Sequence, residues 1–192
     1  MITVGFAICG SFCTFKSVFK EIENLVKTGY DVIPIMSENA YSFDTRFGEA
    51  LFWQNEFKRI TGKEIIHTIK DAEPIGPKKL LDILVIAPCT GNTLAKLSAG
   101  IADTSVTLAT KAHLRNARPL VIAVSTNDAL SNAGKNIGNL LNMKNTYFVP
   151  FRQDSFKNKP CSCVADFSLL EKTIGNALNG IQIQPILDIP IE

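Results

Sequence analysis

Two kinds of hydrophobic pattern alternate along this chain. Short runs are continuously apolar, which is typical of strands buried on both faces of a parallel sheet. Between these runs, apolar residues recur at helical spacing, as at Phe15, Val18, Phe19 and Ile22. We therefore expect strands at residues 3–9, 31–36, 64–67, 81–87, 119–125 and 146–149, and helices at residues 15–26, 44–60, 93–99, 105–111, 133–142 and 166–178.

The alternation of strands and helices predicts the fold class. Buried strands that follow one another through helices form a parallel sheet with helices on both faces. We expect an α/β protein with three layers and a doubly wound parallel sheet of the Rossmann or flavodoxin-like type. Residues 71–79 contain Pro74, Gly76 and Pro77, which predicts a loop. Residues 1–180 are expected to form a single domain, and residues 181–192 a C-terminal tail.

Composition narrows the function classes without identifying one. The chain has 192 residues, 46% of them hydrophobic and 20% charged, with a net charge of +2. This balance gives no basic surface for nucleic acid and no apolar run that spans a membrane, so we expect neither as a partner. The first residues do not resemble a signal peptide. The five cysteines are an odd number without zinc-binding spacing, which favours reduced thiols in the cytoplasm and no metal site.

Polar residues follow several of the predicted strands directly. Gly10 and Ser11 follow the first strand, Ser37 the second, Thr90 a central one, and Asn127 the strand after that. Ligands of open α/β sheets bind at the carboxyl ends of the strands, so these residues predict a binding site. Each has an ordinary alternative. Ser11 and Thr14 are equally suited to cap the next helix. Ser37 suits a plain turn, and Asn127 suits a cap of the segment that follows it.

Charged and imidazole side chains add one further candidate. Arg46 lies at the expected start of a helix, where its guanidinium suits either a carboxylate ligand or a surface cap. The two histidines, His67 and His113, lie outside any polar cluster, and we expect structural roles for both. His113 is expected near a helix end, as a cation that complements the helix dipole.

The segment at residues 88–93 carries a family resemblance. It reads Pro88-Cys89-Thr90-Gly91-Asn92-Thr93 and resembles the Pro-Ala-Ser-Ala-Asn-Thr motif of the homo-oligomeric flavin-containing cysteine decarboxylases. The resemblance implies a flavoprotein fold with FMN lying across the strand-end loops. It also implies a homo-oligomer that is a trimer or a multiple of a trimer. The residues that it assigns to FMN are Gly10, Ser11, Ser37, Pro88, Thr90, Asn92 and Thr93. We also expect Asn127 to face the flavin or the substrate ring, because its amide can both donate and accept hydrogen bonds.

Two departures from these decarboxylases concern catalysis. Their catalytic histidine lies a little upstream of the motif, where this chain has no histidine in residues 73–78. Their Pro-x-Met-Asn motif corresponds to Val124-Ser125-Thr126-Asn127, which keeps only the asparagine. The departures disfavour decarboxylation of a cysteine substrate.

A second resemblance covers nearly the whole chain. The chain resembles the family of dipicolinate synthase B subunits at residues 8–11, 45–49, 86–88 with 90–92, 125–130, 150–151 with 153–154, and 184–187. This implies a cytoplasmic protein of the mother cell in sporulating bacteria, with an NAD(P)-binding A subunit as partner. The implied reaction oxidises a cyclic intermediate of the dihydrodipicolinate pathway to dipicolinate. Asn127 and Arg46 are the candidates for catalytic contact with the substrate.

Three questions about function stay open at this point. The hydride acceptor is either FMN on this chain or NAD(P) on the A subunit. FMN is either retained or absent, and a chain without it would be a non-catalytic scaffold with a flavin-like fold. An FMN-dependent decarboxylase of a small thiol substrate is the remaining alternative.

Overall fold

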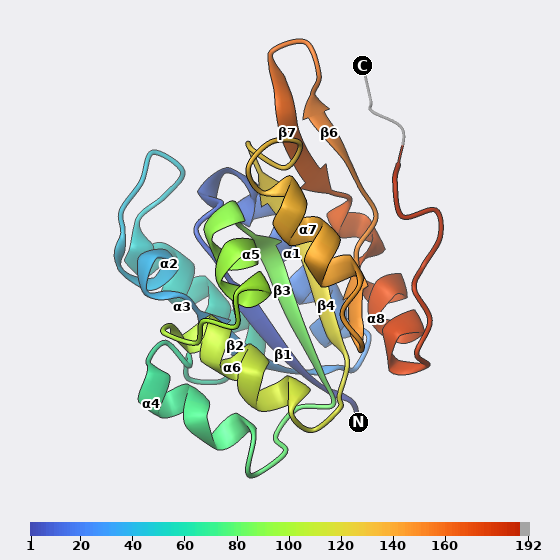
Figure 1. Ribbon diagram of the computed structural model, residues 1–192. Helices are drawn as coiled ribbons and strands as arrows, with labels where there is room; N and C mark the ends of the chain where they lie inside the picture. Colours follow the sequence, from blue (N-terminus) through green and yellow to red (C-terminus); the bar gives the residue numbers. More distant parts are fainter. Residues whose placement is uncertain (189–192) are drawn as a thin grey trace.

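A parallel sheet forms the centre of the protein in the computed structural model, which describes residues 1–188 (Figure 1). In that part of the chain the strands are β1 (Thr3–Ile8), β2 (Asp31–Met36), β3 (Ile83–Cys89), β4 (Leu120–Thr126), β5 (Thr146–Phe148), β6 (Phe151–Ser155) and β7 (Lys159–Ala165). The first five run parallel in the order β2-β1-β3-β4-β5. Chain order reverses beside β1, so ligands are expected at the carboxyl ends of β1 and β3.

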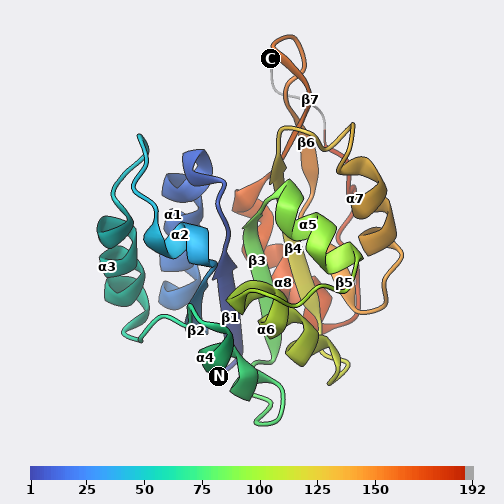
Figure 2. The same ribbon diagram turned by 60° about the vertical axis from the view of Figure 1, so that its left-hand side comes forward.

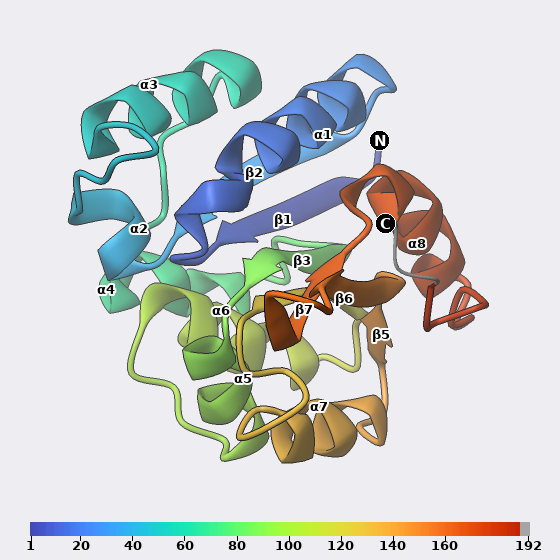
Figure 3. The same ribbon diagram turned by 90° about the horizontal axis from the view of Figure 1, so that it is seen from above.

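Helices cover both faces of this sheet. They are α1 (Phe15–Lys27), α2 (Glu38–Ser42), α3 (Ala50–Thr61), α4 (Ile69–Ala72), α5 (Gly91–Ser98), α6 (Ser105–Leu114), α7 (Gly134–Leu141) and α8 (Leu170–Leu178), with 3-10 turns η1 (Phe12–Thr14), η2 (Glu73–Ile75) and η3 (Phe167–Leu169). Figure 3 shows α1, α3 and α8 on one side and α5, α6 and α7 on the other, and in Figure 2 α5 and α6 lie in front of β3 and β4 with α8 behind them. The prediction of a three-layer, doubly wound α/β fold is confirmed.

The strands and helices form where burial favours them. All seven residues of β3 are buried, as a strand covered on both faces requires. Helix α1 buries Phe15, Val18, Phe19, Ile22 and Leu25, which repeat at helical spacing along one face. These side chains pack in one continuous core with the strands.

An antiparallel hairpin of β6 and β7 makes the sheet mixed, and the sequence did not predict it. Ser125 and Thr126 at the end of β4 pair with Val164 and Cys163 of β7. Because β5 pairs with the first half of β4, the hairpin extends the sheet only at its carboxyl edge. In Figure 1 it projects beyond the rest of the sheet. The hairpin therefore adds a wall at the edge where a ligand is expected.

Three local predictions were wrong. The helix expected from residue 44 begins at Ala50, because the Asp44 carboxylate accepts the Ala50 backbone N–H (2.8 Å) while the chain turns between them. Residues 71–79 are not all loop, since α4 and η2 cover part of them and the Thr68 hydroxyl caps α4. The strand expected at 64–67 amounts to an isolated bridge at Ile66.

His113 lies in the last turn of α6, as the sequence suggested, but it is buried, which disfavours the suggested cation. It is 1% exposed, and its Nε2 forms a hydrogen bond of 2.9 Å with the Pro119 carbonyl. Burial lowers the pKa of His113 below its usual value, although this hydrogen bond acts in the opposite direction. A neutral imidazole that donates to Pro119 fits this environment.

The end of the chain runs beside the hairpin strand β6. The Gln182 side chain forms hydrogen bonds with the backbone of Phe148, and the Phe151 N–H donates to the Ile186 carbonyl. The division into a domain at 1–180 and a tail at 181–192 stays a prediction, and residues 189–192 lie outside the described part. Across residues 1–188, none of the helices has the length and apolar character needed to cross a membrane.

Candidate functional site

Two adjoining cavities open at the carboxyl edge of the parallel sheet. Their volumes are about 910 Å³ and about 360 Å³. Gly10, Phe12, Thr90 and Asn92 line both of them, so we treat the pair as one strand-end cleft. The size is within the range of small-molecule and cofactor sites. The loops after β1, β2, β3 and β4 thus meet at one site, as the sequence predicted.

Ser11 connects two of these loops. Its hydroxyl shares a hydrogen bond of 2.7 Å with the hydroxyl of Ser125, at the end of β4. Neither Ser11 nor Thr14 accepts a hydrogen bond from a backbone N–H at the start of η1 or α1. The capping alternative for these two residues is therefore wrong, and Ser11 lines the larger cavity instead.

The Thr90 loop joins β3 to α5. Thr90 caps the helix, because its hydroxyl accepts the Thr93 N–H at 3.3 Å. The Thr93 hydroxyl in turn donates to the Cys9 sulfur at 3.3 Å, which ties the start of α5 to the end of β1. Asn92 is exposed in the cleft. The N-terminal end of α5, where backbone N–H groups lack partners within the helix, therefore faces the cleft.

Gly91 allows the loops after β3 and β4 to approach closely. A Cβ atom at this position would lie 2.7 Å from both Asp128 Oδ1 and Thr126 Oγ1. These two oxygens are themselves joined, because the Thr126 hydroxyl donates to Asp128 at 2.5 Å. Glycine at the place of a motif alanine thus leaves room for the adjacent Thr126–Asp128 pair.

Ser37 lies in the smaller cavity with Asn39, Lys96 and Thr104. Its hydroxyl accepts the Ala40 N–H at 3.3 Å and so caps the short helix α2. The structural role that the sequence allowed for Ser37 is therefore present, and the residue also faces the cleft. Thr93 lines this cavity too.

Asn127, Pro88 and Arg46 differ in their position relative to the cleft. Asn127 is exposed in the larger cavity, and within residues 1–188 its side chain forms no hydrogen bond. Pro88 is buried inside β3 and lines neither cavity. Arg46 is exposed outside the cleft, with its guanidinium 4.8 Å from the ring centre of Phe47, which does line the cavity. The roles suggested for these residues stay predictions.

The β6–β7 hairpin contributes cleft residues that the sequence did not single out. Asp154, Lys159 and Ser162 line the larger cavity. Lys159 Nζ donates to Asp154 Oδ2 at 3.0 Å, and the Ser162 hydroxyl lies 3.5 Å from the same oxygen. The sequence signal for this hairpin was weak. Two segments flank a turn at residues 156–158, but their polar and apolar residues do not alternate as in a strand.

The cysteines near the cleft differ in exposure. Burial raises the pKa of the Cys9 thiol to about 11, and burial also raises the pKa of Cys89 well above its usual value. Both are therefore protonated at neutral pH and unsuited to nucleophilic chemistry. Cys13 is exposed at the mouth of the cleft.

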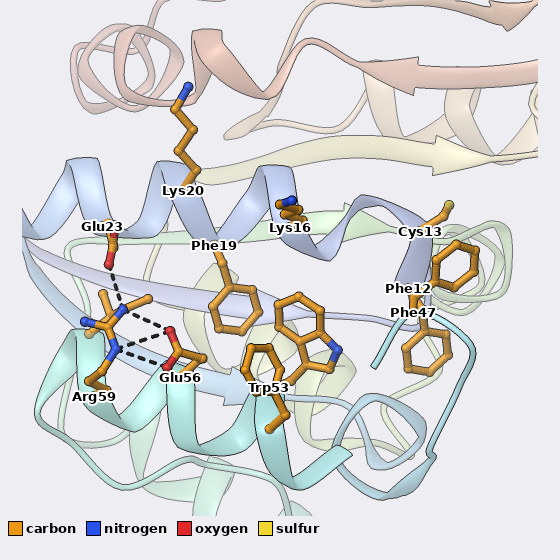
Figure 4. A pocket seen from close by; sticks show the side chains of 12 residues that line it. Phe12, Cys13, Lys16, Phe19, Lys20, Glu23, Phe47, Trp53, Glu56 and Arg59 are labelled. Carbon is orange, nitrogen blue, oxygen red and sulfur yellow. Dashed lines mark hydrogen bonds and ion pairs between the residues drawn. The ribbon is translucent and has the colours of Figure 1, made fainter. Parts of the chain in front are cut away.

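A separate groove of about 540 Å³ lies between α1 and α3 (Figure 4). Phe19 and Trp53 form its apolar floor, with ring centres 4.9 Å apart. One end is closed by Arg59, which donates to Glu23 at 2.7 Å and to Glu56 at 2.9 Å. The other end reaches the strand-end cleft through shared wall residues such as Phe12.

Comparison with known proteins places the chain in a family. The Flavoprotein family model matches residues 1–176. The dipicolinate synthase B subunit of Bacillus subtilis (strain 168) is 47% identical over 184 residues, covering 96% of this chain and 92% of the relative.

Solved structures agree with this assignment. The crystal structure of the dipicolinate synthase B subunit from Bacillus halodurans C has a TM-score of 0.91 and 44% identity, covering 99% of this chain and 97% of the other. The FMN-dependent cysteine decarboxylase SpaF has a TM-score of 0.68 at 24% identity, covering 93% and 96%, and shows the shared fold. The resemblance to dipicolinate synthase B subunits is confirmed in sequence and fold, and the resemblance to the cysteine decarboxylases in fold. This chain belongs to the Flavoprotein family and, within it, to the family of dipicolinate synthase B subunits.

Proposed function

We propose that the chain is the B subunit of a two-protein dipicolinate synthase. With an NAD(P)-binding A subunit, it would oxidise the cyclic dihydrodipicolinate-pathway intermediate to dipicolinate in a sporulating cell. The observation that carries the proposal is the strand-end cleft, whose loops come from the segments that resemble the B-subunit family. Formation of an aromatic ring makes the oxidation favourable, so the cleft has mainly to bind and orient the substrate.

The donor set of the cleft suits FMN. Hydroxyl, amide and backbone N–H groups line much of the cleft, which fits a ring with polar edges and a ribityl chain. We propose that the flavin spans both cavities and is held by Gly10, Ser11, Ser37, Thr90, Asn92, Thr93 and Asn127. Buried Pro88 would shape the Thr90 loop without touching the flavin. When bound, FMN supplies a hydride acceptor, and NAD(P) on the A subunit is the alternative.

The chain's own residues would handle binding and the proton. Dehydrogenation removes a hydride and a proton from the partly reduced ring. Among the described residues, two carboxylates line the larger cavity, and Asp154 is paired with Lys159, which leaves Asp128 as the candidate proton acceptor of that cavity. Asn127, whose amide both donates and accepts, is placed to contact the ring edge. Arg46 would reach the substrate only if its loop turned toward the cleft.

Reconstitution tests the proposal. The purified chain and the A subunit, each alone and together, are supplied with the precursor, NAD(P) and FMN, and dipicolinate is measured by mass spectrometry. We expect dipicolinate only from the mixture, with Asp128→Asn slowing its formation. If the A subunit alone forms as much dipicolinate as the mixture, this chain makes no catalytic contribution, and the scaffold alternative is favoured. Carbon dioxide release from a cysteine substrate would favour the decarboxylase alternative.

A further inference from the structure

The hairpin wall of the larger cavity is charged differently from its other walls. Among the described residues that line this cavity, Lys159 is the cation, and Asp128 and Asp154 are the carboxylates. Lys159 and Asp154 come from the two strands of the hairpin, whereas Asp128 follows β4. The charges thus form an ion pair on one wall and a separate carboxylate on another.

The ion pair holds Lys159 at the cleft. Its Nζ donates to Asp154 Oδ2 at 3.0 Å, while the side chain stays 60% exposed. The hydrogen bond with Asp154 raises the pKa of Lys159 above its usual value, so the ammonium is charged at every physiological pH. An ammonium carries three N–H donors, and those not used by Asp154 are available to a ligand.

The second carboxylate of the cavity, Asp128, belongs to the loop after β4. Asp128 is engaged by the Thr126 hydroxyl beside Gly91, on the side of the cleft formed by the β3 and β4 loops. An anionic ligand is repelled by Asp128 and meets the cation of this cavity at Lys159 on the hairpin. The Ser162 hydroxyl, 3.5 Å from Asp154, lies on the hairpin too.

We propose that Lys159 is the carboxylate-binding residue of the cleft, specific for a small ring that bears carboxylates. Asp154 holds the Lys159 ammonium in place and weakens its attraction for the ligand. This inference rests on the proposed function for the identity of the ring. Lys159 would bind one carboxylate of the pyridine dicarboxylate, with the ring between the hairpin and the β3 and β4 loops. It replaces Arg46 in this role, since the Arg46 guanidinium stacks over Phe47 outside the cleft.

Removing the cation or the anion of the Lys159–Asp154 pair separately distinguishes carboxylate binding from a structural role in the hairpin. Lys159→Met and Asp154→Asn both remove the hairpin ion pair, but only the first removes the ammonium. We expect Lys159→Met to weaken dipicolinate binding about fivefold, and Asp154→Asn to strengthen it about twofold, as is typical of exposed charge pairs. If the pair only stabilised the hairpin, both variants would shift affinity in the same direction.

The matched control is Lys157, which lies at the hairpin tip with its Nζ 5.6 Å from the ring centre of Phe156 and does not line the cleft. Dipicolinate is titrated calorimetrically into the full chain mixed with the A subunit and FMN, with the A subunit and FMN as background. Lys157→Met should bind as wild type does. Higher salt should weaken binding to wild type more than to Lys159→Met.

The outcomes distinguish the two proposals. If the wild-type mixture binds no dipicolinate above background, the proposed function fails and this inference fails with it. If wild type binds dipicolinate and Lys159→Met binds equally well, the inference alone is overturned. Circular dichroism of each variant shows whether the fold is kept. A variant that loses it is replaced by Lys159→Gln, judged by the same affinity ratio.

Discussion

Gly91→Ala is the change that most directly tests how the cleft is assembled. The substitution restores the residue of the related decarboxylase motif, so sequence similarity alone predicts no harm. The structure predicts the opposite, because the added Cβ would lie 2.7 Å from Asp128 Oδ1 and from Thr126 Oγ1. Real Cβ atoms do not approach so closely, and one of the loops must therefore move.

The expected magnitude follows from overpacking and helix propensity. Forcing an extra carbon into a packed region costs about 1–3 kcal/mol. Alanine recovers less than about 1 kcal/mol of helix propensity, since Gly91 is only the first residue of α5. The net loss is about 1–2 kcal/mol. For a chain of this size, that lowers the melting temperature by roughly 2–8 °C.

The assay is thermal unfolding followed by circular dichroism and by the emission of Trp53, the single tryptophan. Gly138→Ala in α7 is the matched control, because a Cβ there has no neighbour within 4 Å and the change should stabilise the helix by about 0.5–1 kcal/mol. Asp128→Ala removes one of the two clashing oxygens, so its effect should couple with Gly91→Ala by at least about 0.5 kcal/mol. A Gly91→Ala protein as stable as wild type would refute the reasoning.

The remaining predictions concern pH, a surface cluster and a helix cap. Because the folded state depresses the pKa of His113, the unfolded chain binds its proton more readily. Stability should therefore be full above about pH 6.5 and fall below it, and His113→Gln should reduce that slope in melting temperatures measured from pH 5 to 8. Arg59→Gln, which breaks the exposed ion pairs with Glu23 and Glu56, should leave the midpoint of unfolding in urea close to that of wild type. Ser37→Ala should cost about 1 kcal/mol as a lost cap and also weaken FMN binding, whereas an unchanged FMN affinity would remove Ser37 from the cofactor site.

Much of the fold was predictable because the buried strands are locally distinctive. The continuous apolar run of β3 allows few structures other than a doubly covered strand. Parallel strands also bring their carboxyl ends to one edge, so the meeting of Ser11, Ser37, Thr90 and Asn127 followed from their positions after strands. Sequence therefore predicted the cleft through topology more than through any single motif.

The parts that sequence missed depend on contacts between distant segments. The hairpin is joined to β4 by pairing at Ser125 and Thr126, and its own strands mix polar and apolar residues without a clear period. Lys159 becomes a cleft residue only after that pairing forms. In the same way, the local pattern predicts Asp44 as the first residue of a helix, whereas it accepts a hydrogen bond from Ala50 across an intervening turn.

The central claim is that the strand-end cleft holds FMN, and a titration of FMN into the purified chain tests it most directly. Gly10 lines both cavities, and a Cβ there meets nothing closer than Phe12 at 3.6 Å, so Gly10→Val should fill the cleft while leaving the fold intact. We predict saturable FMN binding by wild type and by Gly138→Ala, and its loss in Gly10→Val at an unchanged melting temperature. Absence of FMN binding to wild type, or equal binding by Gly10→Val, would contradict the account.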